Sequence, residues 1–466
     1  MGERRVDSDL MTFTAASPDH GPARLRRVLS LWDLIFYGVV AVTPSAPATV
    51  FGLAEVRSHG HVVLTILGAM VAMVLTAISY GRMAALYPSA GSAYSYVGNG
   101  IHPYCGFVAG WAMLLDYMLI PLFCVIYGSL ALQRAIPALP FAVCAAFFAG
   151  GITLLNLRGI RSTARANQAL LLLMFAVLGW FIVAAIRFIV GRDGTAGLFV
   201  SSALYNPATF DMRAVASATS FAALTYLGFD AVTTLAEDVK NPRKNVLLAA
   251  VSVCAFTGIF GGFLVYLAHL AWPDFRTYQN IETAFIDVTG RVGGIALLKA
   301  TAIMLIFANI GAGLTAQVGA ARLLLGMGRD GVVPEKIFAR LHPVRNTPDT
   351  SILIIGVMAF VGAQFMSYEL TAELLNFGAF LGFMGVNAAV VWKYWLRNPT
   401  PGRRRLLLDL VLPTLGFVFS AVIWLGLNRP AKIAGTIWLA FGFVVIAMRT
   451  RGFREPVVLS SLAGIE

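Results

Sequence analysis

Long apolar stretches alternate with short polar segments along almost the whole chain. A helix needs about 20 predominantly apolar residues to cross a membrane once. Stretches of this kind are centred near residues 42, 72, 117, 148, 177, 224, 258, 308, 357, 382, 416 and 440. The pattern therefore predicts an all-α membrane protein with twelve transmembrane helices.

The composition supports the same class of protein. Of the 466 residues, 58% are hydrophobic and only 12% are charged, and the mean hydropathy is +0.77. Soluble domains carry about twice that share of charged residues. Because the loops between apolar stretches are short, we predict one transmembrane domain over residues 29–448. The polar segments 1–28 and 449–466 are then expected to be cytosolic tails.

The net charge of +12 comes from 35 Lys and Arg residues against 23 Asp and Glu residues. If the first apolar stretch enters from the cytosol, most of the basic residues fall in cytosolic segments, which is the usual bias of membrane proteins. We interpret the charge as a topology signal beside lipid headgroups and not as a nucleic-acid surface. With this orientation, both termini are expected in the cytosol.

Sequence signatures of catalysis and of metal binding are missing. The chain contains no P-loop, no Cys-x-x-Cys, no His-x-x-x-His helix and no nucleophile elbow. The four cysteines have no paired spacing, so we interpret them as small packing residues. We therefore expect no enzymatic activity, no cofactor and no metal site.

The first apolar stretch contains the segment "AVTPSAPATVFG", residues 41–52, with prolines at positions 44 and 47. Proline removes a backbone donor and clashes with the preceding helical turn. In lipid, freed backbone groups are tolerated only where protein or water satisfies them. The segment predicts an opened helix, and Thr43, Ser45 and Ala46 become candidate substrate contacts.

The sixth apolar stretch contains a second candidate break. Thr225, Tyr226, Gly228 and Asp230 interrupt the run over residues 220–238. Glycine eases backbone opening, and Thr and Asp offer local hydrogen bonds. Two independent kinks in packed helices would be the alternative explanation.

The two breaks are five spans apart, as expected of two inverted five-span repeats. We place these repeats at about 29–190 and 214–395, with two extra helices at about 406–448. Interrupted helices at matching positions of two halves indicate the substrate site of a secondary transporter.

Four motifs carry a resemblance to a known family. They are "YPSAGSAYSYV" (87–97), "GFVAGWAMLLDY" (106–117), "GFDAVTTLAEDVKNPRK" (228–244) and the segment 321–353. Together they resemble the amino acid–polyamine–organocation transporter superfamily, in particular bacterial putrescine importers and then cationic amino acid permeases. The resemblance implies a leucine-transporter-type 5+5 fold and alternating access driven by a proton or ion gradient. It also implies a location in the bacterial inner (plasma) membrane.

Two carboxylates are expected deep in the membrane, Asp116 in the third span and Asp230 at the second break. Ionisable residues at such depth are costly and indicate function. Each is a candidate proton carrier, ammonium receptor or structural hydrogen-bonding residue. By contrast, we expect Asp33, at the start of the first span, to cap a helix.

Two kinds of further candidate lie near the breaks. Tyr226 can stack on a cationic substrate. Asn376 in the tenth span and Asn309 in the eighth are additional polar candidates.

The sequence departs from the family pattern in two places. The prolines of the first break remove N–H donors that would hold the carboxylate of an amino acid substrate. No acid that would hold the second amine of a diamine lies close to this break either. The fifth span has Met174 where proton-coupled cationic amino acid members carry a lysine.

The leading prediction is a proton-coupled importer of amino acids or polyamines such as putrescine. An amine or amino acid exchanger, a sodium-coupled carrier, and a non-transporting sensor or channel remain alternatives.

Overall fold

The computed structural model describes residues 29–87, 92–158, 164–329, 334–342, 347–397 and 405–452. The proposed tails 1–28 and most of 449–466 lie outside the described residues, as does part of the 87–97 motif. Within the described ranges the protein is helical, and its only β-type pairing is an isolated bridge between Leu29 and Val239. The prediction of an all-α protein is confirmed.

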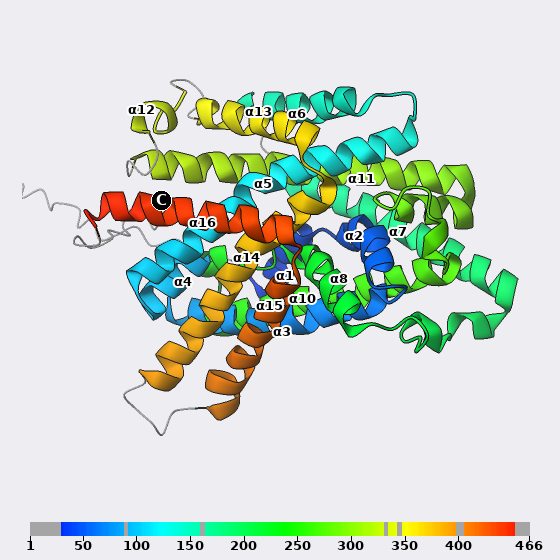
Figure 1. Cartoon of the computed structure of the whole chain (residues 1–466), viewed down its shortest axis with the longest axis horizontal. Coiled ribbons are helices and arrows are strands. Elements are labelled where there is room, and N and C mark those ends of the chain that lie inside the picture. The colour runs from blue at the N-terminus through cyan, green and yellow to red at the C-terminus, as the bar shows by residue number, and fades with distance from the viewer. Residues whose placement is uncertain are drawn as a thin grey trace, which may run out of the picture.

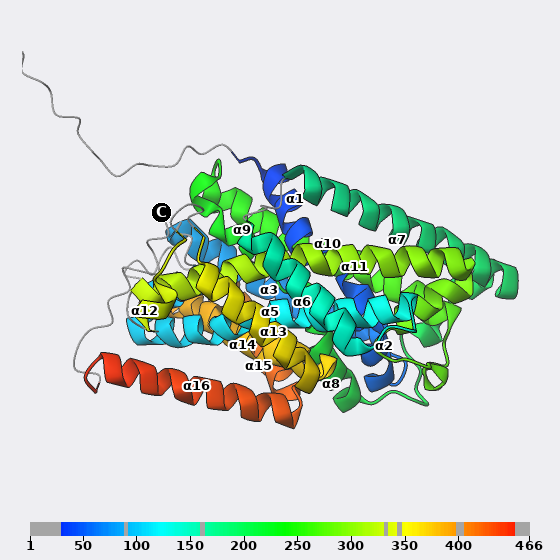
Figure 2. The same cartoon turned by 90° about the horizontal axis from the view of Figure 1, so that it is seen from above.

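Most of the long helices lie side by side along the longest axis of the molecule (Figures 1 and 2). In chain order, the first half comprises α1 (Leu31–Val42), α2 (Ala46–Arg57), α3 (Val62–Leu86), α4 (Ser92–Gly100), α5 (Pro103–Ala135), α6 (Phe141–Leu157) and α7 (Ala164–Asp193). The second half comprises α8 (Met212–Ala222), η3 (Ala223–Tyr226), α9 (Ala231–Thr234), α10 (Pro242–Ala271), α11 (Ala284–Arg329), α12 (Glu335–Phe338), α13 (Asp349–Phe365), α14 (Tyr368–Val390), α15 (Leu412–Gly426) and α16 (Arg429–Arg449). Short 3-10 turns and two π-helical segments, η6 (Val391–Leu396) and η8 (Leu406–Val411), complete the described chain.

Nine helical segments of the described chain are long and apolar enough to cross a membrane. A tenth candidate is the pair α1 and α2, which passes the same test together but is bent by 48° between its halves. Two shorter apolar helices, α6 and α13, fall in the order where the sequence predicts the fourth and ninth spans. The helices confirm a multi-pass membrane protein, while the twelve-span layout stays a prediction.

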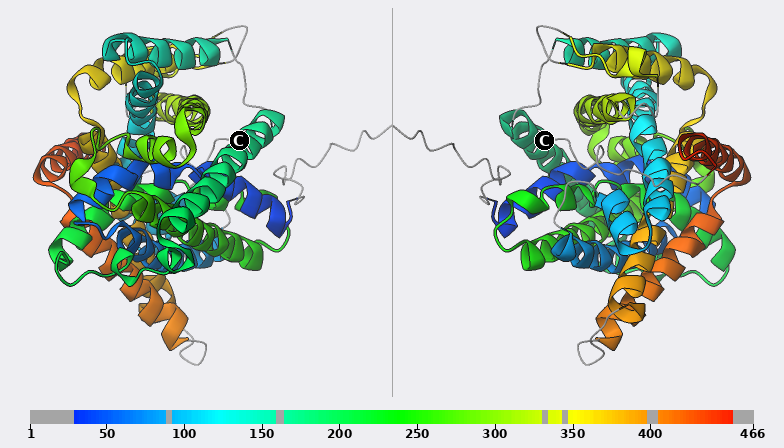
Figure 3. Two further views of the ribbon diagram at one scale, coloured as in Figure 1. Left: turned by 90° about the vertical axis from the view of Figure 1, so that its right-hand side faces the viewer. Right: turned by 90° about the vertical axis from the view of Figure 1, so that its left-hand side faces the viewer.

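Two groups of closely packed helices lie around the breaks. α3 lies along α10, and α5 packs against both α11 and α14. The apolar interior is contributed by residues of both halves of the chain, including Phe51 of α2, Phe221 of α8 and Phe377 of α14. Figure 3 shows α16, in red, on the outside of the bundle.

A pair of tryptophans fixes α16 against α5. The indole Nε1 of Trp111 donates to the carbonyl of Trp438 at 2.9 Å, and the indole of Trp438 donates to the carbonyl of Trp111 at 2.9 Å. The two rings are stacked with centroids 4.9 Å apart. Each indole donor thus finds an acceptor in the partner helix, which matters because an unpaired N–H in lipid is expensive.

The start of α1 is closed by a capping box. The hydroxyl of Ser30 accepts from the N–H of Asp33, and the Asp33 carboxylate accepts from the N–H of Ser30 at 2.8 Å. Both end donors of the helix are therefore satisfied locally. The prediction that Asp33 caps a helix is confirmed.

Candidate functional site

The first span is interrupted at Thr43, Pro44 and Ser45. Thr43 ends α1 with a φ of 60°, and α2 resumes at Ala46. The N–H of Ala46 donates to the Thr43 carbonyl at 3.0 Å, which closes a short turn between the half-helices. The structure thus places an opened backbone where the two prolines predict one.

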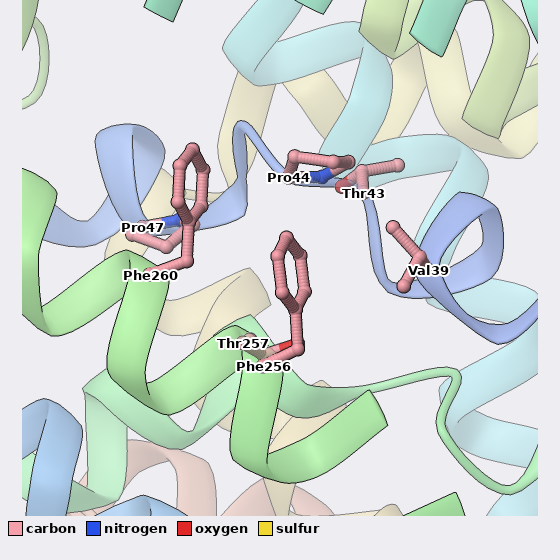
Figure 4. A pocket seen from close by; sticks show the side chains of 7 residues that line it. All are labelled: Val39, Thr43, Pro44, Pro47, Phe256, Thr257 and Phe260. Atoms are coloured by element: carbon pink, nitrogen blue, oxygen red, sulfur yellow. The ribbon is translucent and has the colours of Figure 1, made fainter. Parts of the chain in front are cut away.

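A narrow pocket with no room for a water molecule in this conformation adjoins this break (Figure 4). It lies between the break and α10 and is lined by Val39, Thr43, Pro44, Pro47, Phe256, Thr257 and Phe260. Its walls are two prolines, two phenylalanines and one valine, with only two hydroxyls. Such a lining suits an apolar segment of a ligand and not a charged group.

The second break lies directly against the first. The α-helix α8 gives way to the 3-10 turn η3, Leu227 is extended, and Gly228 has a φ of +100°. A Cβ atom at position 228 would lie 3.0 Å from the carbonyl oxygen of Ala41, at the end of α1. Glycine is needed at Gly228 both for its left-handed conformation and for this close approach.

Asp116 of α5 and Asp230 at the second break form a pair of buried carboxylates. Their side chains are only 7% and 6% exposed, and their charges are close enough to interact. In the described chain, Asp116 Oδ1 and Asp230 Oδ2 have no hydrogen-bonding partner. None of the ion pairs found among the described residues involves either carboxylate. The structure therefore buries both acids that the sequence analysis singled out within range of each other's charge, and no described Lys, Arg or His forms an ion pair with either.

Three tyrosines lie near Asp230. Tyr37 of α1, Tyr80 of α3 and Tyr117 of α5 all lie within electrostatic range of Asp230. The Tyr80 ring also packs edge-on against Phe229, with centroids 5.5 Å apart. Sequence reasoning missed these tyrosines because nothing in their local patterns relates three separate helices to the break. The one available signal was a hydroxyl-bearing side chain inside an apolar run.

Three of the sequence candidates have side-chain donors bonded to backbone carbonyls. The Tyr226 hydroxyl donates to the Ile66 carbonyl at 2.8 Å, and Asn376 Nδ2 donates to the Ser220 carbonyl at 2.7 Å. Asn309 Nδ2 donates to Leu305 within its own helix. Tyr226 and Asn376 therefore hold α8 and η3 in place beside the break.

Ser45, at the first break, faces α7. It is 2% exposed, and its hydroxyl is 4.0 Å from the Met174 sulfur on α7. The structure thus places Met174 beside the break, where the family resemblance implies a lysine. Among the first-span candidates, Thr43 and Ala46 are more exposed than Ser45.

Charged residues also connect the far end of α2 to its neighbours. Arg57 pairs with Glu369 and with the fully buried Glu373 of α14, the latter at 2.6 Å. Glu373 also accepts from the N–H of Asn428 at 2.7 Å. Sequence reasoning missed this cluster because its members are more than 300 residues apart and meet only through packing.

Residues 29–459 match the family model described as amino acid permease. The chain belongs to the amino acid permease family. It is 28% identical over 445 residues to the "Low-affinity putrescine importer PlaP" of Escherichia coli (strain K12), an alignment that covers 95% of this chain and 97% of the relative. It is also 26% identical to the "Methylthioribose transporter" of Bacillus subtilis (strain 168), covering 92% and 94% of the two chains. A third relative, the "Branched-chain amino acid permease BcaP" of Lactococcus lactis, is 27% identical with coverage of 90% and 93%.

These matches confirm the superfamily that the sequence motifs indicate. Family membership and the apolar helices together make the protein a non-enzymatic, multi-pass membrane transporter.

Proposed function

We propose that the protein is a secondary active transporter that imports a small organic amine across the bacterial plasma membrane, with a diamine such as putrescine as the preferred substrate. Transport runs by alternating access and is coupled to protons. The proposed architecture is twelve spans in a leucine-transporter-type 5+5 arrangement with two extra helices. Both termini are cytosolic.

The observation that carries this proposal is the pair of buried carboxylates, Asp116 and Asp230, beside two helix breaks that touch. A buried carboxylate is costly unless a cation or a proton compensates it. No described Lys, Arg or His pairs with either acid, so the compensating charge is supplied from outside the chain. A diamine brings two ammonium groups to two carboxylates, and protons replace them when the substrate leaves.

The composition of the first break also favours an amine. Pro44 and Pro47 offer no N–H groups to a substrate carboxylate. The adjoining pocket with its proline and phenylalanine walls offers a surface for methylene groups. The relative from Escherichia coli is named a putrescine importer, which agrees with this choice.

An amino acid is the second candidate. In the part of the chain that the structure describes, the backbone N–H groups of Ser45 and Gly228 have no acceptor. Backbone donors at opened half-helices are the groups that bind substrate carboxylates in transporters with broken helices. Under this alternative, Asp116 or Asp230 receives the single ammonium group.

The test is uptake into proteoliposomes with an inward proton gradient, using labelled putrescine and labelled neutral and cationic amino acids. We expect wild type to accumulate putrescine, and we expect Asp230→Asn and Asp116→Asn to lose gradient-driven accumulation. Asp193→Asn, which alters an exposed carboxylate, is the matched control and should accumulate like wild type.

Ligand-dependent thermal stabilisation of the purified protein identifies the substrate class. A ligand of the folded state at about 100 times its Kd adds about 2.7 kcal/mol to stability. Stabilisation by amino acids but not by diamines would replace the first candidate by the second. If both aspartate variants accumulate substrate with an unchanged pH dependence, the coupling role assigned to them is wrong.

A further inference from the structure

A second acidic residue on the first span forms a direct contact with a histidine. Oε1 of Glu55, near the end of α2, is 2.5 Å from Nδ1 of His269, in the last turn of α10. The Glu55 side chain is fully buried, and the His269 side chain is 10% exposed. The second carboxylate oxygen, Oε2, has no partner within the described ranges.

The groups that face Glu55 and His269 do not supply a countercharge to the Glu55 carboxylate. The phenol of Tyr278, in the segment between α10 and α11, lies within electrostatic range of Glu55 and carries no charge near neutrality. Tyr278 in turn interacts with Asp274 and with Arg291 of α11, and the Arg291 guanidinium lies over the ring of Trp272.

Two other ionisable groups at this end of the molecule, Arg57 and His61, are bonded elsewhere. Arg57 is paired with two glutamates of α14. His61, before α3, has its Nδ1 2.9 Å from the Ser58 carbonyl and its Nε2 3.1 Å from the N–H of Asn206. His269 is therefore the one described group that contacts the Glu55 carboxylate.

The charge of the pair depends on how many protons it holds. With one shared proton, the pair is neutral and its hydrogen bond is charge-assisted. Without a proton, the pair is a buried carboxylate beside a neutral imidazole and has no countercharge. With two protons, it is a buried imidazolium beside a neutral carboxyl group and again has no countercharge. A buried net charge is costly, so the singly protonated state is the stable one. A cationic imidazole in the last turn of α10 also interacts favourably with the helix dipole.

We propose that Glu55 and His269 form a proton-binding site on the outer side of the transporter, distinct from Asp116 and Asp230. The proton comes from the external water and is shared between Oε1 and Nδ1, with no other bond made or broken. While it is bound, the outer half of the first span is held to α10. The proposal rests on the proposed function for its orientation and for its effect on transport, but not for proton binding itself. A proton needs no cavity, which agrees with the close packing around the pair.

Proton binding is tested first without any transport measurement. The thermal midpoint of the purified protein is recorded from about pH 5 to about pH 9, the range in which imidazoles titrate. In wild type, loss of the shared proton leaves a buried charge, so the midpoint falls as the pH rises through this range. Glu55→Gln and His269→Gln should lack that component of the fall. His61→Asn is the matched control, since its ring nitrogens bond to backbone groups and not to a carboxylate, and it should keep the fall.

A single variant that leaves one partner unpaired and buried can fail to fold. The double variant Glu55→Gln/His269→Gln has no charge at any pH and can retain a hydrogen bond, so it serves as the second variant. Over the pH range where wild type changes, its midpoint should lack the component of the fall that Glu55 and His269 cause. If the double variant keeps the pH dependence of wild type, the proton-binding site is elsewhere and the proposal is wrong.

The effect on transport is tested in proteoliposomes with the internal pH held constant and the external pH varied. We expect the initial uptake rate of wild type to change about tenfold over about two pH units, as for one titrating site, and we expect the double variant to change less than about twofold. Counterflow exchange at equal pH on both sides should persist in the double variant. Absence of wild-type uptake would refute the proposed function while leaving the stability test valid. An unchanged external pH dependence in a variant that transports would refute the effect of this site on transport.

Discussion

The two halves of the first span, α1 and α2, are each twelve residues long but differ in how deeply they are buried. Eight of the twelve residues of α2 are buried, against three of the twelve residues of α1. α2 packs against α8, α10 and α11, and its last turns carry Glu55 and Arg57, both paired. α1 packs against α10 and α9, and it exposes Trp32 and Phe36. In Figures 2 and 3, α1 lies at the edge of the molecule.

The difference shows that one broken span contains a fixed half and a less constrained half. Burial and buried ion pairs raise the free energy needed to displace α2, while α1 has fewer contacts to lose. The break at Thr43 lets each half respond separately, because no helical hydrogen-bond ladder runs through it. If the protein works by alternating access, α1 is the half that moves first in the conformation described here.

The largest expected effect concerns the fixed half. Arg57→Gln leaves the buried Glu373 carboxylate without its guanidinium partner, and breaking a buried ion pair costs about 3–5 kcal/mol. The thermal midpoint of the purified protein should fall accordingly, whereas Asp193→Asn, in an exposed pair, should leave it near the wild-type value. The double variant Arg57→Gln/Glu373→Gln should recover most of the loss. No recovery would mean that the arginine stabilises α2 by packing on Phe221 and not by its charge.

The next effect concerns the contact between the breaks. Gly228→Ala forces a left-handed backbone on alanine, at about 1–3 kcal/mol, and puts a Cβ 3.0 Å from the Ala41 carbonyl. We expect uptake to fall by about tenfold or more, since 1.4 kcal/mol corresponds to tenfold. Gly294→Ala is the matched control, because it has a φ of +70° and open space around the added Cβ. Equal losses in the two variants would show that strain, and not the approach of the breaks, limits transport.

A smaller effect is expected at the start of α1, the less constrained half of the first span. Ser30→Ala removes the capping box and should cost about 1 kcal/mol. Hydrogen–deuterium exchange should increase over residues 31–42 and not over residues 46–57. The comparison variant Ser367→Ala removes a cap from α14, where the hydroxyl accepts from Leu370 N–H at 3.1 Å, and should leave the exchange of α1 unchanged. Faster exchange of both halves after Ser30→Ala would contradict their independence.

The smallest effect concerns Glu282, in the connection that covers α2. Partial burial raises the pKa of this carboxyl group above its usual value. The folded state therefore holds the proton more tightly than the unfolded state, so this contribution to stability is complete below the usual Glu range and is lost as the pH rises through the folded pKa. Glu282→Gln should remove that shallow decline of the thermal midpoint. A steeper decline in the variant would mean that the carboxylate is stabilised by a cation and not destabilised by burial.

Local patterns predicted the features that depend on local chemistry. The prolines at 44 and 47 indicated the first break, and the Gly228 and Asp230 pattern indicated the second. The position of Asp33 at the start of the first apolar stretch indicated the cap of α1. Acids inside apolar runs identified Asp116 and Asp230, because such placement is expensive without a purpose.

The missed features are those whose partners meet only through tertiary packing. Glu55 and His269 are 214 residues apart, and each stands at the end of an apolar run where a polar residue is ordinary. The same holds for the tyrosines near Asp230. For Tyr226, the sequence showed a hydroxyl that needs a partner, but only the fold could supply the Ile66 carbonyl as that partner.

The tryptophan pair between α5 and α16 has a consequence for the order of biosynthesis. Trp111 lies in an early part of the chain, five residues before Asp116, whereas Trp438 belongs to α16, the last helix that the structure describes. Until α16 is inserted, the Trp111 indole lacks the carbonyl that it bonds in the finished protein, and it stands in lipid without that acceptor. The helix that carries Asp116 therefore reaches its final environment only after synthesis of the whole membrane domain. Ribosomes stalled before residue 429 should yield chains in which α5 is inserted but still open to other binding partners, such as membrane chaperones.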